Sequence, residues 1–232
     1  MAILYITKVS SNDSEIKYRS LLSHDIIAEN TSKISNTGYL HAHLTALSLL
    51  TMAVREYTKT DGFILHKLNK TDNGKPYLSG DEYPKFNWSH TGDIILLGIS
   101  KTEIGVDIEQ VKERNVLPIA KRFFSEREYQ YIKNCNDEKD RFFEMWVIRE
   151  SIGKYIGDGI QSFTSIKIDP GNRKIYHENK LLPCCVWSGT YQNFKIADVT
   201  KDEQIKIKKI DCDKCTSEEL ETNKILSLYQ SI

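Results

Sequence analysis

The sequence predicts an α+β fold built as a pseudo-dimer of two similar halves, each with a helix packed on a mostly antiparallel sheet. Three observations support this. Residues 39–57 carry an apolar stripe of helical period, Ile104–Gln110 alternates apolar and polar side chains, and a second long run free of proline spans Asp137–Ile156. Because a helix is followed by short strands in each half, we expect one half at 1–102 and the other at 103–232.

The first half contains one clear helix among short strands. We predict this helix at Tyr39–Tyr57, where Leu44, Leu47, Leu50 and Val54 recur on one face. The predicted strands are Ile3–Val9, Phe63–Lys67, Lys85–Ser89 and Ile94–Ser100.

The second half opens with the strand Ile104–Gln110 and continues into helices. We predict a short helix at Leu117–Phe123, a helix opened by the capping box Ser125-x-x-Glu128, and the long helix Asp137–Ile156. Four strands complete it: Ser162–Asp169, Cys184–Ser188, Tyr191–Ala197 and Ile205–Lys209. The polar segment after Asp211 is expected to form a short helix at Ser217–Tyr229.

Composition limits the functional classes. The 232 residues are 40% hydrophobic, and 32 basic residues balance 32 acidic ones, so the chain is expected to be globular and not to bind nucleic acid in bulk. No apolar run is as long as a membrane span, and the first residues resemble a strand, not a signal peptide. We therefore expect a cytoplasmic protein that does not interact with a membrane.

A group of carboxylates is the strongest chemical signal. Asp107 and Glu109 share one face of their strand, roughly 6–7 Å apart, and Glu150 and Lys154 stand one turn apart on the long helix. Three converging carboxylates would raise their own pKa values unless a hard cation such as Mg²⁺ lay among them. The simpler alternatives are a solvated strand face and an ordinary helix-surface ion pair.

Five segments in order resemble the signature of the 4′-phosphopantetheinyl transferases. They are Gly74-Lys75-Pro76-Tyr77, Phe86-Asn87-Trp88-Ser89-His90-Thr91, Ile104-Gly105-Val106-Asp107, Phe124-Ser125-x-x-Glu128 and Trp146-x-x-Arg149-Glu150-Ser151-x-x-Lys154. The first two resemble the surfactin-synthetase-activating (Sfp-like) branch. The resemblance covers roughly residues 70 to 160.

The resemblance implies a function. Members transfer the 4′-phosphopantetheine arm of coenzyme A to a serine of an acyl or peptidyl carrier protein and release 3′,5′-adenosine bisphosphate. It also implies Mg²⁺ bound by Asp107, Glu109 and Glu150, with Lys154 acting on the developing charge. Glu150, or Glu109 through a water, would accept the serine proton. Sfp-like members are monomers built as two halves, which supports the pseudo-dimer.

The resemblance places further residues at the cofactor. Lys75 would reach its adenosine end, and Ser89 and His90 would bind its phosphates. The alternative for Lys75 and His90 is an exposed turn residue. Arg149 replaces the family's usual lysine before the catalytic glutamate, which preserves a charge able to contact phosphate.

The N-terminal ligands of the 3′-phosphate stay open. Family members commonly carry a basic cluster there, whereas this chain has only scattered basic residues: Lys17, Arg19, Lys33, His41 and His43.

Two alternative functions remain. One is a different Mg²⁺-dependent phosphotransfer enzyme or hydrolase, and the other is a non-catalytic module that binds carrier proteins. Leu117, Ile119, Phe123 and Phe124, with Lys121 and Arg122 beside them, form either a carrier-docking surface or part of the core.

The cysteines favour reduced thiols over a zinc site. Cys212 and Cys215 form a C-x-x-C pair, but Cys184 and Cys185 are adjacent, so on a strand they would point to opposite faces.

Overall fold

The computed structural model describes residues 1–9, 20–62, 64–211 and 216–231. They form an α+β fold with two compact units. Unit 1 comprises Met1–Thr102 and Gln204–Leu220, and unit 2 comprises Glu103–Glu203 and Glu221–Ile232. The predicted halves were continuous, and the structure corrects this. Residues 204–220 return to unit 1, because β12 (Ile205–Asp211) pairs in parallel with β1 (Ala2–Lys8).

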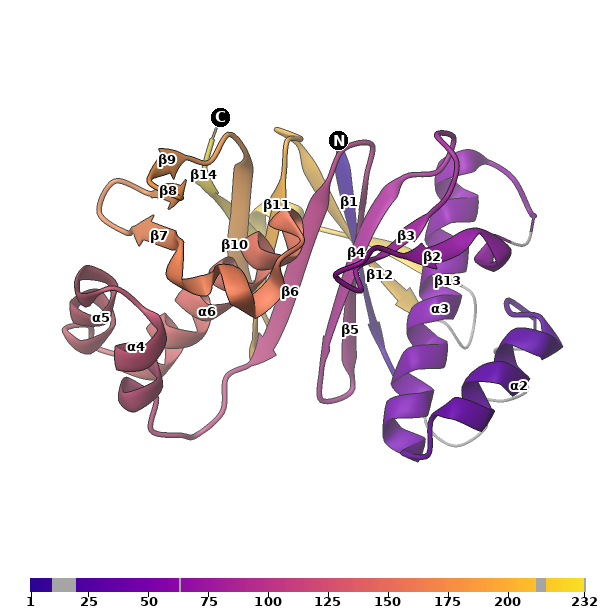
Figure 1. The fold of residues 1–232 in the computed structure, drawn as a ribbon, viewed down its shortest axis with the longest axis horizontal. Helices are drawn as coiled ribbons and strands as arrows, with labels where there is room; N and C mark the ends of the chain where they lie inside the picture. Colours follow the sequence, from indigo (N-terminus) through magenta and orange to yellow (C-terminus); the bar gives the residue numbers. More distant parts are fainter. Residues whose placement is uncertain (10–19, 63, 212–215, 232) are drawn as a thin grey trace. The chain divides into compact units, whose positions relative to one another are not determined.

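Unit 1 is a five-stranded sheet carrying one long helix (Figure 1). The strand order is β13-β12-β1-β5-β4, and every pairing except β1–β12 is antiparallel. Besides β1 and β12, its elements are α2 (His24–Lys33), α3 (Thr37–Thr58), η1 (Leu65–Lys67), β2 (Leu68–Lys70), β3 (Pro76–Leu78), β4 (Lys85–Thr91), β5 (Ile94–Ser100) and β13 (Thr216–Leu220).

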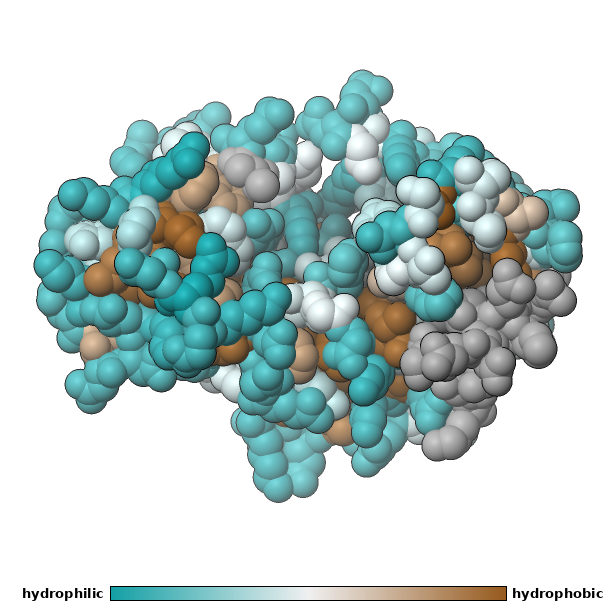
Figure 2. All heavy atoms as spheres, turned by 90° about the horizontal axis from the view of Figure 1, so that it is seen from below, coloured by the Kyte–Doolittle hydropathy of each residue, from teal (hydrophilic) through white to brown (hydrophobic). Residues whose placement is uncertain are grey.

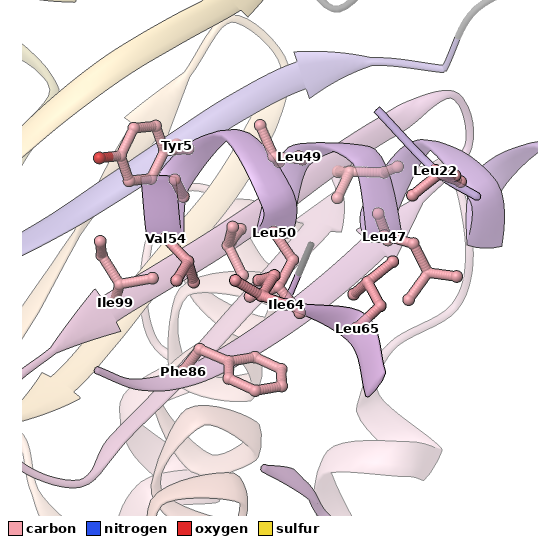
Figure 3. Close-up of a cluster of buried hydrophobic side chains, with 14 of the residues drawn as sticks. Tyr5, Leu22, Leu47, Leu49, Leu50, Val54, Ile64, Leu65, Phe86 and Ile99 are labelled. Atoms are coloured by element: carbon pink, nitrogen blue, oxygen red, sulfur yellow. The ribbon is translucent and has the colours of Figure 1, made fainter. Parts of the chain in front are cut away.

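The core of unit 1 lies between α3 and the sheet. Figure 3 shows Leu47, Leu50 and Val54 of α3 beside Phe86 and Ile99 of the strands. The apolar stripe read from the sequence therefore faces the sheet, as predicted. Burying each of these side chains contributes roughly 1.5–3 kcal/mol.

Unit 2 has a four-stranded antiparallel sheet in the order β14-β10-β11-β6. Its other elements are a small three-stranded sheet and the helices. In chain order the unit contains β6 (Ile104–Gln110), α4 (Leu117–Phe123), α5 (Glu126–Lys133), α6 (Glu138–Ile156), η2 (Gly159–Thr164), β7 (Ile166–Asp169), β8 (Lys174–His177), β9 (Lys180–Leu181), β10 (Cys185–Tyr191), β11 (Phe194–Thr200), α7 (Thr222–Ile225) and β14 (Leu226–Gln230).

Local sequence signals fix the ends of α5 and α6. Ser125 and Glu128 form the predicted capping box of α5, with both reciprocal hydrogen bonds present. Asp137 caps α6 by accepting a hydrogen bond from the Asp140 N–H at 2.9 Å. Gly157 ends α6 in the left-handed conformation, with φ of 98°.

Three predicted elements differ from the structure. The strand expected at Phe63–Lys67 is the short 3₁₀ helix η1, and the strand expected from Ser162 begins at Ile166, after η2. The helix expected at Ser217–Tyr229 is wrong, because most of this segment forms β13 and β14 at sheet edges, with one turn of helix between them. Pairing with β12 and β10 outweighs the weak helical pattern.

Polar side chains predominate on the face drawn in Figure 2, and apolar side chains show in smaller separate areas. Within the described part of the chain, no helix is long and apolar enough to cross a membrane.

Candidate functional site

Close packing of α6 on β6 places the candidate catalytic side chains. A Cβ atom on Gly105 would lie 2.1 Å from the Ser151 carbonyl oxygen and 2.4 Å from the Tyr155 backbone nitrogen. Only a glycine lets the backbone of α6 approach the strand this closely. The glycine of the Ile104-Gly105-Val106-Asp107 motif therefore sets the distance between the helix and the strand.

This packing brings four predicted residues together in unit 2. Asp107 is 3% exposed, and its Oδ1 accepts a hydrogen bond from Lys154 Nζ at 2.7 Å. Glu150 lies one turn before Lys154 on α6, and Glu109 follows Asp107 on the same face of β6. The strand thus contributes two carboxylates, and the helix contributes one carboxylate and one ammonium group.

The charges of this group act on Glu150. Burial is the largest cause that raises the pKa of Glu150 to about 7, and the neighbouring Asp107 charge raises it further. The Lys154 ammonium opposes this shift, and Glu109 adds to it. Three negative charges are therefore close enough for the helix carboxylate to take up a proton near neutral pH.

The donor set fits a hard cation, although its side chains are not gathered around one point. Among the described residues, no group of three or more His, Cys, Asp and Glu side chains is arranged to hold a metal ion. In this structure Lys154 supplies the positive charge at Asp107. Carboxylates such as Asp107, Glu109 and Glu150 are nevertheless the oxygen ligands that Mg²⁺ prefers.

Arg149 requires a correction. Its side chain is 1% exposed, so it does not present its guanidinium to a phosphate in this structure. It donates to Glu128 and to the Phe163 and Ile166 carbonyls, and it lies over the Phe124 ring. Arg149 is therefore a core residue that links α6 to the start of α5.

Glu128 explains the Phe124-Ser125-x-x-Glu128 motif. It is fully buried, and its Oε2 caps α5 by accepting from the Ser125 N–H at 2.7 Å. Its Oε1 accepts from Arg149 and from the Ile168 N–H. The capping signal was visible in the sequence, whereas the partner across the fold was not.

Gly153, in the last turn of α6, also has a packing role. A Cβ atom there would lie 2.7 Å from the Gly159 carbonyl oxygen, so the glycine makes room for η2. Trp146, on the same helix, packs among Phe123, Phe142 and Phe163 as an aromatic core residue.

The predicted cofactor residues of unit 1 lie on β4 and before β3. Ser89 and His90 lie near the end of β4, where Ser89 is buried and His90 is exposed. Gly92 follows in the hairpin turn with a φ of 57°. Lys75 is partly buried and directly precedes β3. Lys17, Arg19, Cys212 and Cys215 lie outside the described residues, and Cys184 and Cys185 carry buried free thiols.

Unit 1 also contains a cavity of about 580 Å³ that sequence reasoning did not identify. Its wall includes the aromatic rings of Tyr39, His43 and Trp88. Its charged groups are Lys33, Lys70 and Glu29, and Glu29 pairs with Lys33. Burial and the charges of Lys70 and His90 lower the pKa of His43. The cavity joins flat apolar surfaces to nearby positive charge, a combination suited to an aromatic anion.

Residues 103–208, which contain the carboxylate group, match the family model of the 4′-phosphopantetheinyl transferase superfamily. This segment is similar to the members of that superfamily. The chain is similar to the 4′-phosphopantetheinyl transferase gsp of Aneurinibacillus migulanus, with 36% identity over 123 residues, covering 51% of each chain. It is 30% identical to the 4′-phosphopantetheinyl transferase Sfp of Bacillus subtilis (strain 168) over 117 residues, or 50% of each chain.

A third relative is the putative 4′-phosphopantetheinyl transferase of Haemophilus influenzae, 30% identical over 142 residues, which are 59% of this chain and 58% of the relative. The chain thus spans about half the length of the curated phosphopantetheinyl transferases it matches.

Proposed function

We propose that the chain transfers the 4′-phosphopantetheine arm of coenzyme A to a serine of an acyl or peptidyl carrier protein, releasing 3′,5′-adenosine bisphosphate. The observation that carries this proposal is the group formed by Asp107, Glu109, Glu150 and Lys154, inside the segment that matches the superfamily. Its relatives are named for this transfer reaction.

Asp107, Glu109 and Glu150 are the residues that would hold Mg²⁺. When bound, the ion would neutralise charge on the pyrophosphate of coenzyme A and on its leaving oxygen. The pKa of Glu150 is raised mainly by burial and further by Asp107 and Glu109, and a cation bound among the three carboxylates would offset the part due to their charges. The three carboxylates would have to turn toward a common point.

Lys154 and Glu150 have separate roles in the proposed reaction. Lys154 would exchange part of its contact with Asp107 for the pyrophosphate, where negative charge grows as the bond to phosphorus breaks. The serine hydroxyl attacks the pantetheine-side phosphorus, and its proton passes to a carboxylate. Glu150 is the first candidate to accept it, and Glu109 through a water is the second candidate.

The cavity of unit 1 is where we propose the adenosine end binds. Its aromatic wall would stack on adenine, Lys75 would reach the adenosine end, and Ser89 and His90 would contact the phosphates. Lys33 is one of the basic residues from the N-terminal third that line this cavity, and we propose it as a candidate ligand of the 3′-phosphate. Arg149 is not among the proposed ligands, because it is buried.

We propose α4 as the carrier-docking surface. Lys121 and Arg122 are exposed, and Ile119 and Phe123 are partly exposed beside them, whereas Phe124 belongs to the core. Basic side chains around apolar ones would complement a carrier that presents its serine in an acidic context. Arg122→Glu is then expected to raise KM for the carrier several-fold with little effect on KM for coenzyme A.

We also propose that the two units form a pseudo-dimer, acting as a cytoplasmic monomer. The strand order β1-β5-β4 in unit 1 repeats as β6-β11-β10 in unit 2, with antiparallel pairing throughout. The hairpins have the same register: one pairs Lys85 with Ser100 through Thr91 with Ile94, and the other pairs Cys185 with Thr200 through Tyr191 with Phe194.

A polar contact is repeated with the hairpins. Tyr5 in β1 and Asp107 in β6 lie opposite Leu97 and Ala197, at equivalent places in the two sheets. Tyr5 donates to Glu56, near the end of α3, as Lys154, near the end of α6, donates to Asp107. Unit 1 therefore has a tyrosine where unit 2 has its first carboxylate, which supports duplication followed by specialisation of unit 2.

Intact-mass measurement of an apo carrier protein, incubated with the chain, coenzyme A and Mg²⁺, tests the proposed function. A gain of one phosphopantetheine per carrier is expected, together with 3′,5′-adenosine bisphosphate. Release of the bisphosphate without a carrier adduct would indicate a hydrolase. Binding of the carrier without either product would indicate a non-catalytic module.

A further inference from the structure

A buried lysine lies beside the carboxylate group and takes no part in the proposed reaction. Lys195 of β11 is directly opposite Glu109 of β6 in the antiparallel ladder. Residues so paired point to the same face, with Cβ atoms about 4.5–5.5 Å apart. The Lys195 side chain is 9% exposed, and opposite charges on a cross-strand pair of this kind can attract each other.

The ammonium of Lys195 is directed elsewhere. Its Nζ lies 2.7 Å from Asp140 Oδ1 and 2.8 Å from Asp140 Oδ2, and it donates to Thr190 Oγ1 at 2.9 Å. Asp140 lies in the first turn of α6, where Asp137 fixes its backbone through the helix cap. The bidentate contact therefore holds the positive charge toward the beginning of α6.

The position of this charge matters for any cation bound at Glu109. A lysine ammonium on Glu109 would satisfy that carboxylate and repel a divalent ion at the same point. A buried ammonium without a partner is costly, so Lys195 must pair with some carboxylate. Asp140 of α6 is its partner in this structure, and Glu109 is the acidic residue directly opposite it on β6.

We propose that Asp140 is a positioning residue for the metal site, which keeps the Lys195 ammonium away from Glu109. The proposal rests on the proposed function in that it takes Glu109 as a cation ligand. It predicts opposite effects for the two members of one ion pair. Loss of Asp140 lets the Lys195 ammonium pair with Glu109 and weakens binding of the cation. Loss of Lys195 removes the positive charge that would compete with the cation for Glu109.

The test is a double-mutant cycle on the full-length chain, with Mn²⁺ as the probe and coenzyme A present. Electron paramagnetic resonance of free Mn²⁺ gives the dissociation constant without any turnover. Asp140→Asn should raise the dissociation constant for Mn²⁺ about tenfold. Lys195→Met should leave it at or below the wild-type value, and the double variant should return to the Lys195→Met value. Lys167→Met, which alters an exposed lysine bonded to Asn179, is the control and should match the wild type.

A purely structural ion pair gives a different pattern. Asp140→Asn and Lys195→Met would then weaken Mn²⁺ binding to the same extent, and the double variant would bind Mn²⁺ no more tightly than Asp140→Asn. That result would overturn the proposal. An unchanged constant in Asp140→Asn would also overturn it, as would a wild type that binds no Mn²⁺. Arm transfer to a carrier, measured separately by mass, would still decide the proposed function.

Discussion

Single residues show most clearly what the sequence could and could not reveal about this site. The proximity of Asp107, Glu109, Glu150 and Lys154 was predicted from strand and helix periodicity, because both faces follow directly from spacing. Arg149 was misassigned, because its charge suggested a phosphate contact. Its true partner, Glu128, lies 21 positions away and meets it through folding alone.

Arg149→Lys should therefore damage stability, since a lysine cannot reproduce the planar guanidinium contacts to Glu128 and to two carbonyls. We expect the free energy of unfolding to fall by about 3 kcal/mol, near the lower end for a broken buried pair. Urea denaturation measures it. Arg127→Lys, at an exposed ion pair with Asp169, is the matched control and should lose less than about 1 kcal/mol. Equal losses in both variants would show that Arg149 is not a structural residue.

Asp198 predicts a dependence of stability on pH. Burial, and to a smaller extent Asp202, holds the pKa of Asp198 well above its usual value. A raised folded-state pKa of an acid favours the folded state while the group is protonated, and this contribution is lost as pH rises through the folded pKa. Asp198→Asn removes the titration. Its stability relative to the wild type should increase between pH 4 and pH 8 in denaturant titrations, and a constant difference would contradict the assignment.

At the scale of elements, helices with capping signals were predicted well and the tail was not. The capping box of α5 and the Asp137 cap of α6 are local, so sequence alone locates those helix starts. Strands β13 and β14 form because they pair with β12 and β10. The sequence pattern of residues 216–230 does not contain these distant partners. α2 was missed because its polar residues, with Ile27 its one buried residue, give little periodicity.

Gly105→Ala tests the packing of α6 on β6. The added methyl group would overlap backbone atoms of Ser151 and Tyr155, so the helix must move away and take Glu150 and Lys154 from Asp107. Overpacking of this kind costs about 1–3 kcal/mol, and we expect arm transfer to fall at least tenfold in protein that still folds. Gly171→Ala, where the nearest atom would be 3.5 Å away, should keep wild-type activity and melting temperature. A fully active Gly105→Ala protein would show that this close approach is unnecessary.

For the whole molecule, the predicted halves 1–102 and 103–232 agree only in part with the two units, because residues 204–220 belong to unit 1. Ile205, Ile207 and Ile210 of β12 are buried beside β1, so unit 1 is completed by residues that follow most of unit 2. A strand that returns to a distant sheet leaves no local trace, because its alternation suits either unit equally.

Two truncations should separate the units. A chain ending at residue 203 lacks β12 and β14, so β1 and β10 should both lose protection in hydrogen-exchange mass spectrometry. A chain ending at residue 220 keeps β12 and β13, and protection should then be lost in β10 while β1 stays protected. Persistent protection of β1 in the shorter chain would contradict the assignment of residues 204–220 to unit 1.

We expect the carboxylate group on β6 and α6 to be the site of arm transfer. The most direct measurement is the rate of phosphopantetheine transfer to an apo carrier by Asp107→Ala, at saturating coenzyme A and Mg²⁺, followed by intact mass. Loss of the buried carboxylate that contacts Lys154 should cost a few kcal/mol of transition-state stabilisation, or about a hundredfold or more in rate, in folded protein. An Asp107→Ala protein that transfers the arm at the wild-type rate would contradict the claim.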